Sequence, residues 1–378
     1  MSATSWDGLI VMCSGTSWDG MATSPKEIAL RLARSGPVLF VDPPRSFVSA
    51  RRRAHRGTTS SRRGVYEIGD RLARMTPLVQ PGIDRPGLAR FTEATVKRQL
   101  RRAVRELRAD VDAVIVANQR DVFGACDERR RIVFATDDFV AGAELMGVRR
   151  SVLQAQQQRQ ARSADLVVCV TPEIAETWTG LGVETAVLAN GCDPELFADV
   201  DDTPYASDVT LPSPIVGCVG HLSDRIDVAL LDAVADTGVS LLLVGPRQPV
   251  DGLDRLLARA NVQWIDQRPL TTMPGYLRWI DVGLTPYADT AFNRGSFPLK
   301  TLDYLAAGRR VVATGLPATR RLDTDLVAIA DTPADFAAAV TSELARPVTN
   351  DDVQRRQAFA AANSWEARAA ELRKLVAT

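Results

Sequence analysis

The chain of 378 residues contains few cysteines, few histidines and few lysines. No two cysteines have the CxxC spacing, and only two histidines are present, so neither a zinc site nor a disulfide framework is predicted. Several cysteines lie in apolar runs such as LVVCVT and IVGCVG, and we therefore expect buried, reduced thiols. The five cysteines are Cys13, Cys126, Cys169, Cys192 and Cys218.

Long hydrophobic runs are also absent, because nowhere do about 18 apolar residues follow one another, and the sequence predicts no membrane span. The first residues, MSATSWDGLIVMCSG, carry no basic segment ahead of their short apolar run, so we interpret them as a first strand rather than a signal peptide. Basic and acidic residues balance at 46 each. We expect a cytoplasmic protein with at most peripheral membrane contact.

Short apolar runs alternate with helical patterns along the chain, which is typical of parallel sheets built from βα units. The length fits two domains. We predict strands at LIVMCSG, VLFVDP, DAVIVAN, RIVFAT, LVVCVT and TAVLANG in the first half, and at IVGCVG, LLLVG, VQWI, VGLTPY, RVVAT and LVAIA in the second. We predict helices near 26–34, 88–107, 152–164, 172–181, 224–234, 253–260, 272–279 and 296–307.

The polar, proline-containing segment 199–214 is the predicted boundary between the domains. We place the first domain at 1–200 and the second at 210–363. Ligands of open α/β sheets bind outside the carboxyl ends of the strands, so two such domains that face each other form a cleft. The predicted fold class is therefore α/β, with two Rossmann-like parallel-sheet domains and an interdomain cleft.

The segment 292–314, FNRGSFPLKTLDYLAAGRRVVAT, combines a polar loop, an amphipathic helix and a buried strand. Ser296 as N-cap with Pro298 in the first turn predicts the start of the helix, and Gly308 predicts its end. Lys300 and Asp303 follow Ser296 at i+4 and i+7, on one polar face. The alternative is an ordinary amphipathic helix with a solvated Lys and Asp.

A helix N-terminus attracts anions, so we expect a pyrophosphate at Arg294, Gly295 and Ser296, with Lys300 beside it. Asp303, deeper in the helix, is expected to accept hydrogen bonds from ribose hydroxyls. Lysine is rare in this chain, with four among 46 basic residues, which favours a specific use of a compact ammonium at position 300.

This segment resembles the donor-binding element of GT-B glycosyltransferases of the family 4 type. In the teichuronic-acid-type and actinobacterial branch the element reads roughly P-L-K-x-x-E-Y-L-A-A-G-x-P-V-V-A-T. The resemblance implies that Asp303 stands where an acidic residue binds the donor ribose. Gly295 stands where the family has an acidic residue that contacts the transferred sugar, and Asn293 lies in the same loop.

Two further segments resemble the same family. The stretch ANGCDPELF, from Ala189, resembles P-N-G-V-D-x-x-x-F at the end of the first domain, and Asn190 and Gly191 suit a turn with positive φ. The stretch VGHLSDR resembles G-R-L-x-x-x-K-G, whose two basic residues bind the donor phosphates. Gly220, His221 and Arg225 are accordingly donor-binding candidates, and His221 is also a catalytic candidate unless it is only a capping or interdomain histidine.

Other candidates lie in loops after predicted strands. Arg268 and Leu270, after VQWI, are expected to contact the nucleotide base through backbone groups. The loop SGTSWDGMATS lacks the GxGxxG spacing of a dinucleotide site, and it is either an acceptor site or a structural turn in which its aspartate binds backbone amides. Its acceptor-binding candidates are Gly15, Trp18 and Asp19.

The sequence TDDFVAG supplies two more acceptor-binding candidates, Asp137 and Asp138, because adjacent carboxylates at a strand end are costly to bury and should face a cleft or solvent. Asp138 and Asp19 are the candidates for orienting the acceptor hydroxyl, which makes them catalytic candidates. No Ser/His/Asp or Cys/His nucleophile arrangement is visible.

The stretch 45–63 contains seven arginines and no acidic residue. It could form a surface that binds anionic lipid, a polyprenyl-phosphate acceptor or a charged natural product. The alternative is a solvated insertion that binds none of these. No nucleic-acid recognition motif accompanies the charge, so nucleic-acid binding is not predicted.

The resemblance implies a retaining glycosyltransferase without metal or cofactor that uses a nucleoside-diphosphate sugar, with UDP favoured over GDP. The acceptor would be a small or lipid-linked hydroxyl or amine compound in antibiotic or envelope polysaccharide biosynthesis. It also implies that the terminal helix 364–378 packs back on the first domain, although it could instead close the second. The alternatives are a GT-B sugar-nucleotide epimerase and a non-catalytic GT-B binding protein, the latter suggested by Gly295 and His221.

Overall fold

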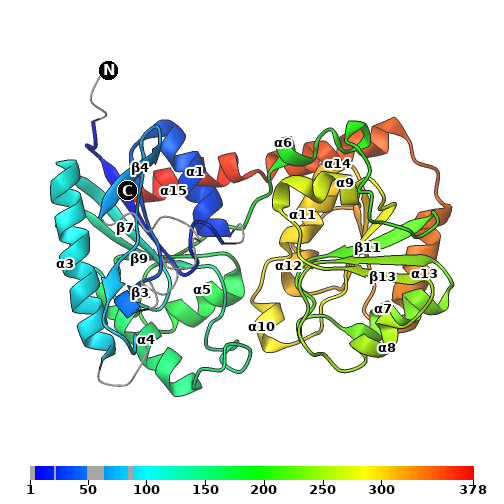
Figure 1. Ribbon diagram of the computed structural model, residues 1–378, viewed down its shortest axis with the longest axis horizontal. Helices are drawn as coiled ribbons and strands as arrows, with labels where there is room; N and C mark the ends of the chain where they lie inside the picture. Colours follow the sequence, from blue (N-terminus) through cyan, green and yellow to red (C-terminus); the bar gives the residue numbers. More distant parts are fainter. Residues whose placement is uncertain (1–4, 21–22, 49–63, 84–87) are drawn as a thin grey trace. The chain divides into compact units, whose positions relative to one another are not determined.

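The computed structural model describes residues 5–20, 23–48, 64–83 and 88–378, arranged as two compact domains (Figure 1). The first domain comprises Met1–Ala189 and Arg368–Thr378, and the second comprises Asn190–Ala367. The segment 199–214 therefore lies inside the second domain, and the end of the chain belongs to the first. Most of the arginine-rich stretch lies outside the described residues, so the proposals for 45–63 stay predictions.

The first domain is built on an eight-stranded sheet in the order β10-β9-β8-β7-β1-β2-β5-β4. All neighbours are parallel except β4, which pairs antiparallel with β5 at one edge. From β1 the chain builds one side of the sheet through β2 and then the other through β7, so the order reverses between β1 and β7. The strands are β1 (Leu9–Ser14), β2 (Val38–Val41), β4 (Val65–Gly69), β5 (Leu72–Met75), β7 (Val111–Ala117), β8 (Arg130–Ala135), β9 (Leu166–Cys169) and β10 (Thr185–Val187), beside a small pair, β3 (Arg45–Ser46) and β6 (Leu78–Val79).

Helices cover this sheet, which explains why strands such as β1 are buried along their whole length. The terminal helix is fixed to α1, because Arg373 Nη2 donates to the carbonyl oxygen of Leu32 at 2.9 Å. Gly36 leaves room for this guanidinium, since a Cβ there would lie 3.0 Å from Arg373 Nη1. The helices are α1 (Ser24–Ser35), α3 (Ala89–Leu107), α4 (Arg150–Ser163), α5 (Pro172–Thr179) and most of α15 (Trp365–Ala377).

The second domain contains a six-stranded, wholly parallel sheet in the order β13-β12-β11-β14-β15-β16. Its order reverses between β11 and β14. In such sheets ligands bind outside the carboxyl ends of the strands at the point of reversal. The strands are β11 (Ile215–Val219), β12 (Ser240–Val244), β13 (Val262–Ile265), β14 (Val282–Thr285), β15 (Arg310–Ala313) and β16 (Val327–Ile329).

Two hydrophobic cores lie on the two faces of this second sheet, because successive strand residues point to opposite sides. Ile215 of β11 packs in one core with Leu302, while the next residue, Val216, packs in the other with Phe336. One face carries α6 (Pro194–Phe197), α9 (Met273–Leu277), α11 (Leu299–Ala306) and α14 (Asn350–Ala362), and the other carries α7 (Val228–Asp236), α8 (Leu253–Leu257) and α13 (Pro333–Ala345) (Figure 1). The short helices α10 (Ala291–Arg294) and α12 (Pro317–Arg320) and the 3₁₀ turns η1 (Val200–Asp202) and η2 (Leu270–Thr272) complete the domain.

The strands expected from the apolar runs are all present, whereas the β4–β5 hairpin was not predicted. The helix expected from residue 224 begins at Val228, because Asp227 caps it by accepting from the amide of Ala229. The five cysteines are free and buried, which confirms the predicted thiols. Burial raises the pKa of Cys126, Cys169 and Cys218 to about 12.

Two local predictions are wrong. Ser296 does not cap α11, which begins at Leu299; its hydroxyl instead donates to the carbonyl oxygen of Phe292 at 3.0 Å, at the end of α10. Neither Asn190 nor Gly191 has positive φ. Gly191 is required for close packing, because a Cβ there would lie 2.8 Å from the backbone of Ser364, beside the bridge that pairs Cys192 with that residue.

No helix among the described residues combines the length and the apolar character that crossing a membrane would need.

Candidate functional site

The ladder between β11 and β14 ends at Gly217 and Gly283, before either strand ends. The hydroxyl of Tyr304, on α11, takes the place of the missing strand partner. It donates to the carbonyl oxygen of Gly217 at 3.2 Å and accepts from the amide of Val219 at 2.7 Å. Tyr304 is fully buried, and its ring lies where a Cβ on Gly283 would be only 2.3 Å away. The helix is thereby fixed at the point where the strand order reverses.

Replacing Tyr304 by phenylalanine is expected to lower the free energy of unfolding by about 1–3 kcal/mol, because the buried amide of Val219 and carbonyl of Gly217 lose a partner. Urea unfolding of the full chain measures the change. Tyr205→Phe is the control, since the Tyr205 side chain is half exposed and its ring packs on Trp279 without need of the hydroxyl. Equal stability of the two variants would contradict the structural role of the Tyr304 hydroxyl.

Lys300 and Asp303 form an ion pair on α11, one turn apart, with Nζ 3.1 Å from Oδ2. Both side chains are largely shielded, with 31% and 17% of their surface exposed. The charge of Asp303 raises the pKa of Lys300, while burial raises the pKa of Asp303 more than the neighbouring ammonium lowers it. The pair therefore offers a fixed cation and a carboxylate beside the reversal of strand order.

Backbone lies open next to Lys300 at the end of β11. Gly220 has φ +148, which glycine tolerates and other residues rarely adopt, and a Cβ there would be 4.0 Å from Lys300 Cε. A ligand group can thus approach the backbone and the ammonium together. The next residue, His221, is exposed.

Arg225 is held in place by its neighbours. Its guanidinium lies over the rings of Tyr287 and Phe292, 5.4 and 5.0 Å from their centroids, and Nε donates to Asn293 Oδ1 at 2.9 Å. Nδ2 of the Asn293 side chain donates to the carbonyl oxygens of Arg225 and Ala288 at 2.9 and 2.8 Å. Asn293 is buried and serves to orient Arg225.

A pocket with an empty volume of about 200 Å³ lies beside Arg225 and is also lined by Asn293 and Ser296. Tyr287 lines it as well. Burial raises the pKa of the Tyr287 hydroxyl more than the charges of Arg225 and Lys300 lower it. The structure therefore brings together six of the predicted donor-binding residues, namely Gly220, Arg225, Asn293, Ser296, Lys300 and Asp303.

Within the part of the chain that the structure describes, no hydrogen bond or ion pair joins the remaining predicted donor-binding residues to Arg225, Lys300 or Asp303. Arg294 is exposed and forms a bidentate ion pair with Asp289, with N–O distances of 2.6 and 2.7 Å. Gly295 is buried at the end of α10. Arg268 and Leu270 follow β13, at the edge of the sheet, where Arg268 donates to Asp208 at 2.9 Å.

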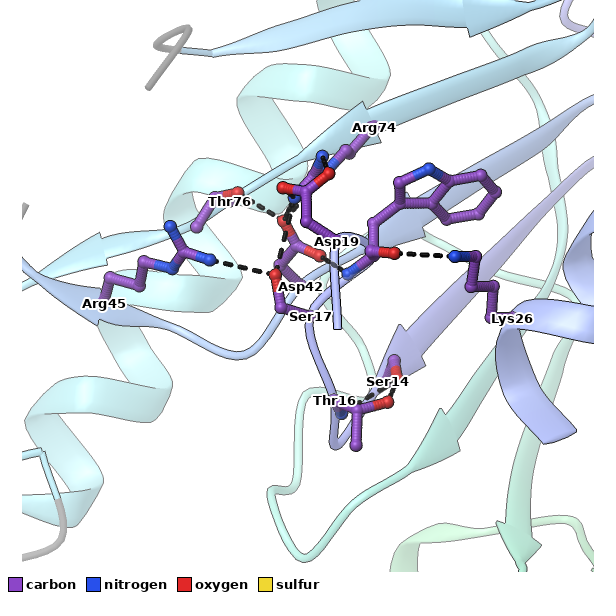
Figure 2. A network of polar contacts seen from close by, with 10 residues as sticks. Ser14, Thr16, Ser17, Asp19, Lys26, Asp42, Arg45, Arg74 and Thr76 are labelled. Atoms are coloured by element: carbon purple, nitrogen blue, oxygen red, sulfur yellow. Dashed lines mark hydrogen bonds and ion pairs between the residues drawn. The ribbon is translucent and has the colours of Figure 1, made fainter. Parts of the chain in front are cut away.

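In the first domain, the loop after β1 is fixed by a polar network centred on Arg74 (Figure 2). Arg74 donates to Asp42 Oδ2 at 2.8 Å and to both carboxylate oxygens of Asp19 at 3.0 and 2.7 Å. The other oxygen of Asp42 accepts from the amide of Trp18 at 2.8 Å. The Trp18 ring meets Phe40 edge-on, and Lys26 Nζ lies 5.1 Å from its centroid.

This network makes Asp42, rather than Asp19, the residue that binds a backbone amide of the loop. The hydrogen bond from Arg74 lowers the pKa of Asp19, so its carboxylate stays charged. Gly15 allows β1 and β7 to approach, since a Cβ there would lie 3.2 Å from the carbonyl oxygen of Ala117.

Asp137 and Asp138 follow β8 and line a pocket with an empty volume of about 450 Å³, formed entirely by the first domain. Asp138 Oδ1 accepts from the amide of Ala141 at 2.9 Å, which fixes the turn that carries both carboxylates. In the ranges that the structure describes, no three His, Cys, Asp or Glu side chains are grouped to hold a metal ion.

Sequence reasoning missed Tyr304, Arg74 and the glutamine Gln160, which lines the same pocket. The dipeptide Gly69-Asp70 between alternating residues was a usable turn signal for the hairpin that carries Arg74. The family pattern P-L-K-x-x-E-Y-L-A-A-G has a tyrosine at the position of Tyr304, so it was a usable signal for that residue. No local signal marked Gln160, because its partner Asn118 is distant in sequence.

Residues 213–346 match the family described as Glycosyl transferases group 1. A protein of Bacillus subtilis (strain 168), TuaH, described as a teichuronic acid biosynthesis glycosyltransferase, is 28% identical over 230 residues, which cover 57% of this chain and 58% of that relative. The match thus spans less than two thirds of the relative's length.

Two solved structures resemble nearly the whole chain. Sucrose-phosphate synthase from Thermosynechococcus elongatus has a TM-score of 0.72 at 15% identity, covering 97% of this chain and 98% of that one. A structure described as trehalose-6-phosphate from E. coli bound with UDP-2-fluoro glucose has a TM-score of 0.70 at 10% identity, with coverage of 97% and 98%. At such identities the likeness shows the fold alone.

Proposed function

We propose that this protein is a glycosyltransferase, because its fold is GT-B and residues 213–346 of its second domain match the family described as Glycosyl transferases group 1. It moves a sugar from a nucleoside-diphosphate sugar to a hydroxyl or amine of an acceptor. The observation that carries the proposal is the Lys300–Asp303 pair beside the open backbone of Gly220, where the strand order of the second domain reverses.

The residues of this site have distinct roles in the proposal. Lys300 and Arg225 neutralise the negative charge that develops on the leaving diphosphate, and electrostatic stabilisation of this kind often contributes more to catalysis than any other effect. Asp303 accepts hydrogen bonds from the ribose hydroxyls. Asn293 positions Arg225, and the exposed His221 contacts the phosphate or the sugar.

The reaction follows from this charge distribution. The bond between the anomeric carbon and the diphosphate oxygen breaks, and its electron pair leaves with the diphosphate. The acceptor oxygen forms the new bond on the same face, and its proton passes to the leaving phosphate. Configuration is retained, and neither a protein nucleophile nor a metal takes part. UDP is the proposed nucleotide, in line with the UDP-sugar analogue bound to the E. coli protein.

The acceptor is assigned to the first domain. Gly15, Trp18 and Asp19 in the loop after β1 and Asp137 and Asp138 after β8 are its proposed contacts. Asp138 or Asp19 orients the acceptor hydroxyl. The likeness to TuaH favours envelope polysaccharide biosynthesis over antibiotic biosynthesis as the setting.

Product analysis tests this function. The protein is incubated with UDP-, GDP-, ADP- and dTDP-sugars, with and without a mixture of acceptors, and free nucleoside diphosphate and sugar products are measured. We expect diphosphate release that depends on acceptor. Formation of an isomerised sugar without acceptor would instead identify an epimerase. Saturable nucleotide binding without turnover would identify a binding protein. A protein that binds no nucleotide would overturn the proposal.

The raised pKa of Asp303 predicts an acidic limit to nucleotide binding. Because burial raises this pKa above 3.8, the carboxylate is lost at a higher pH than usual as the pH falls, and UDP affinity should fall with it. Calorimetry of UDP binding from pH 7 downward measures the effect. Asp303→Asn removes the titrating group, so the difference between the two proteins isolates it from titration of UDP itself. Parallel pH profiles would contradict the ribose role.

A further inference from the structure

The pocket of about 450 Å³ in the first domain lies at the carboxyl ends of β7 and β8, beside α4 and α5. We infer that it binds the acceptor, and that the acceptor is a hydroxylated ring compound with an apolar side and no phosphate or carboxylate group. The inference rests on the proposed function, because it names the substrate class for the acceptor side of that reaction.

Buried apolar side chains form much of the wall. Phe134 from β8, Leu153 from α4, and Ile174 and Trp178 from α5 each expose no more than 5% of their surface. Flat aromatic and aliphatic surfaces suit the apolar face of a ring or an aglycone.

Neutral amides supply most of the polar groups, from Asn118, Gln119, Gln157 and Gln160. Gln160 exposes only 3% of its surface, and its Nε2 donates to the carbonyl oxygens of Asn118 and Arg120 at 2.7 and 3.2 Å. Those bonds fix the amide. No described residue donates to Oε1 of Gln160, so this oxygen can accept from a ligand hydroxyl.

The charge of the lining excludes an anionic ligand. Among the described residues that line the pocket, Asp137 and Asp138 are charged, and arginine, lysine and histidine are absent. A phosphate would lose its hydration without gaining a cation from this lining, and the carboxylate of Asp138 would repel it. That carboxylate would instead attract a hydroxyl or an ammonium group.

Paired probes test the ligand class. Phenyl β-D-glucopyranoside and its 6-phosphate differ only in the phosphate, and their binding to the full chain with UDP present is measured by calorimetry and saturation-transfer NMR. We expect saturable binding of the neutral probe, weakened about tenfold or more by the phosphate. No saturable binding of the neutral probe, or equal or tighter binding of the phosphate, would overturn the inference.

A lysine introduced into the wall of this pocket tests whether the probes bind there. Gln157 is half-buried and lines the pocket, whereas Gln158, next to it on α4, does not line it. Gln157→Lys should shift the preference toward the phosphorylated probe, and Gln158→Lys, the charge-matched control, should leave it unchanged. Equal shifts in both variants would place the probe elsewhere.

The same samples separate this inference from the proposed function. UDP binding belongs to the second domain and should be unchanged in Gln157→Lys. If the wild-type protein binds UDP but prefers the phosphorylated probe, the ligand class is wrong and the proposed function stands. If it binds no nucleotide, the proposed function fails first.

Discussion

Lys300→Met should lower kcat/KM by about 100- to 1,000-fold with any donor that supports turnover, because the variant removes a fixed charge that acts on the leaving group. The pair with Asp303 keeps Lys300 protonated at neutral pH, since the carboxylate raises the pKa of its ammonium. Steady-state kinetics of diphosphate release measures the effect. The loss should appear in kcat as well as KM, because charge on the diphosphate grows as the bond breaks.

A double variant separates catalysis from stability. Lys300→Met alone leaves the shielded carboxylate of Asp303 without its cation, which destabilises the fold. Lys300→Met combined with Asp303→Asn removes both charges and should recover stability but not activity. Arg355→Met is the control for loss of a cation, because Arg355 is about half exposed and pairs with Asp325 on the surface. Recovery of activity in the double variant would show that Lys300 acts only on folding.

The positions of Lys300 and Asp303 could be predicted from sequence because helix periodicity is a local property. A spacing of three places two side chains on one face of a helix wherever that helix packs. The start of the same helix could not be predicted, because Ser296 had two possible partners. Its hydroxyl binds the carbonyl of Phe292 behind it rather than an amide ahead, and only the conformation of α10 decides between them.

The strands of both sheets were predictable for a similar reason, since strands buried on both faces appear as continuous apolar runs. The hairpin of β4 and β5 lies at the edge of the first sheet. A charged residue interrupts the apolar residues of each strand, so the sequence pattern that would predict these strands was weak. The partners of Arg74 were beyond prediction, because Asp19 and Asp42 come from loops separated from it by 55 and 32 residues.

Arg74→Met should lower the free energy of unfolding of the first domain by about 3–5 kcal/mol, because it leaves a buried carboxylate without its cation. The Asp42 side chain is wholly buried and that of Arg74 is 8% exposed. Burial alone would lower the pKa of Arg74, but its bonds to Asp19 and Asp42 outweigh that effect and raise it. Hydrogen exchange of peptides within residues 9–42 and urea unfolding measure the loss.

Variants of Asp42 and Asp19, the two partners of Arg74, show which carboxylate determines the loss of stability. Asp42→Asn combined with Arg74→Met should recover much of the stability, because no buried charge remains. Asp19→Asn alone should cost no more than about 1 kcal/mol, since that carboxylate is 48% exposed. Its pKa is lowered from 3.8 by the Arg74 hydrogen bond, so its contribution is present above that pH and is lost as the pH falls through the folded pKa. An Arg74→Met protein as stable as the wild type would mean that water reaches Asp42 and that the loop bearing Trp18 is fixed by other contacts.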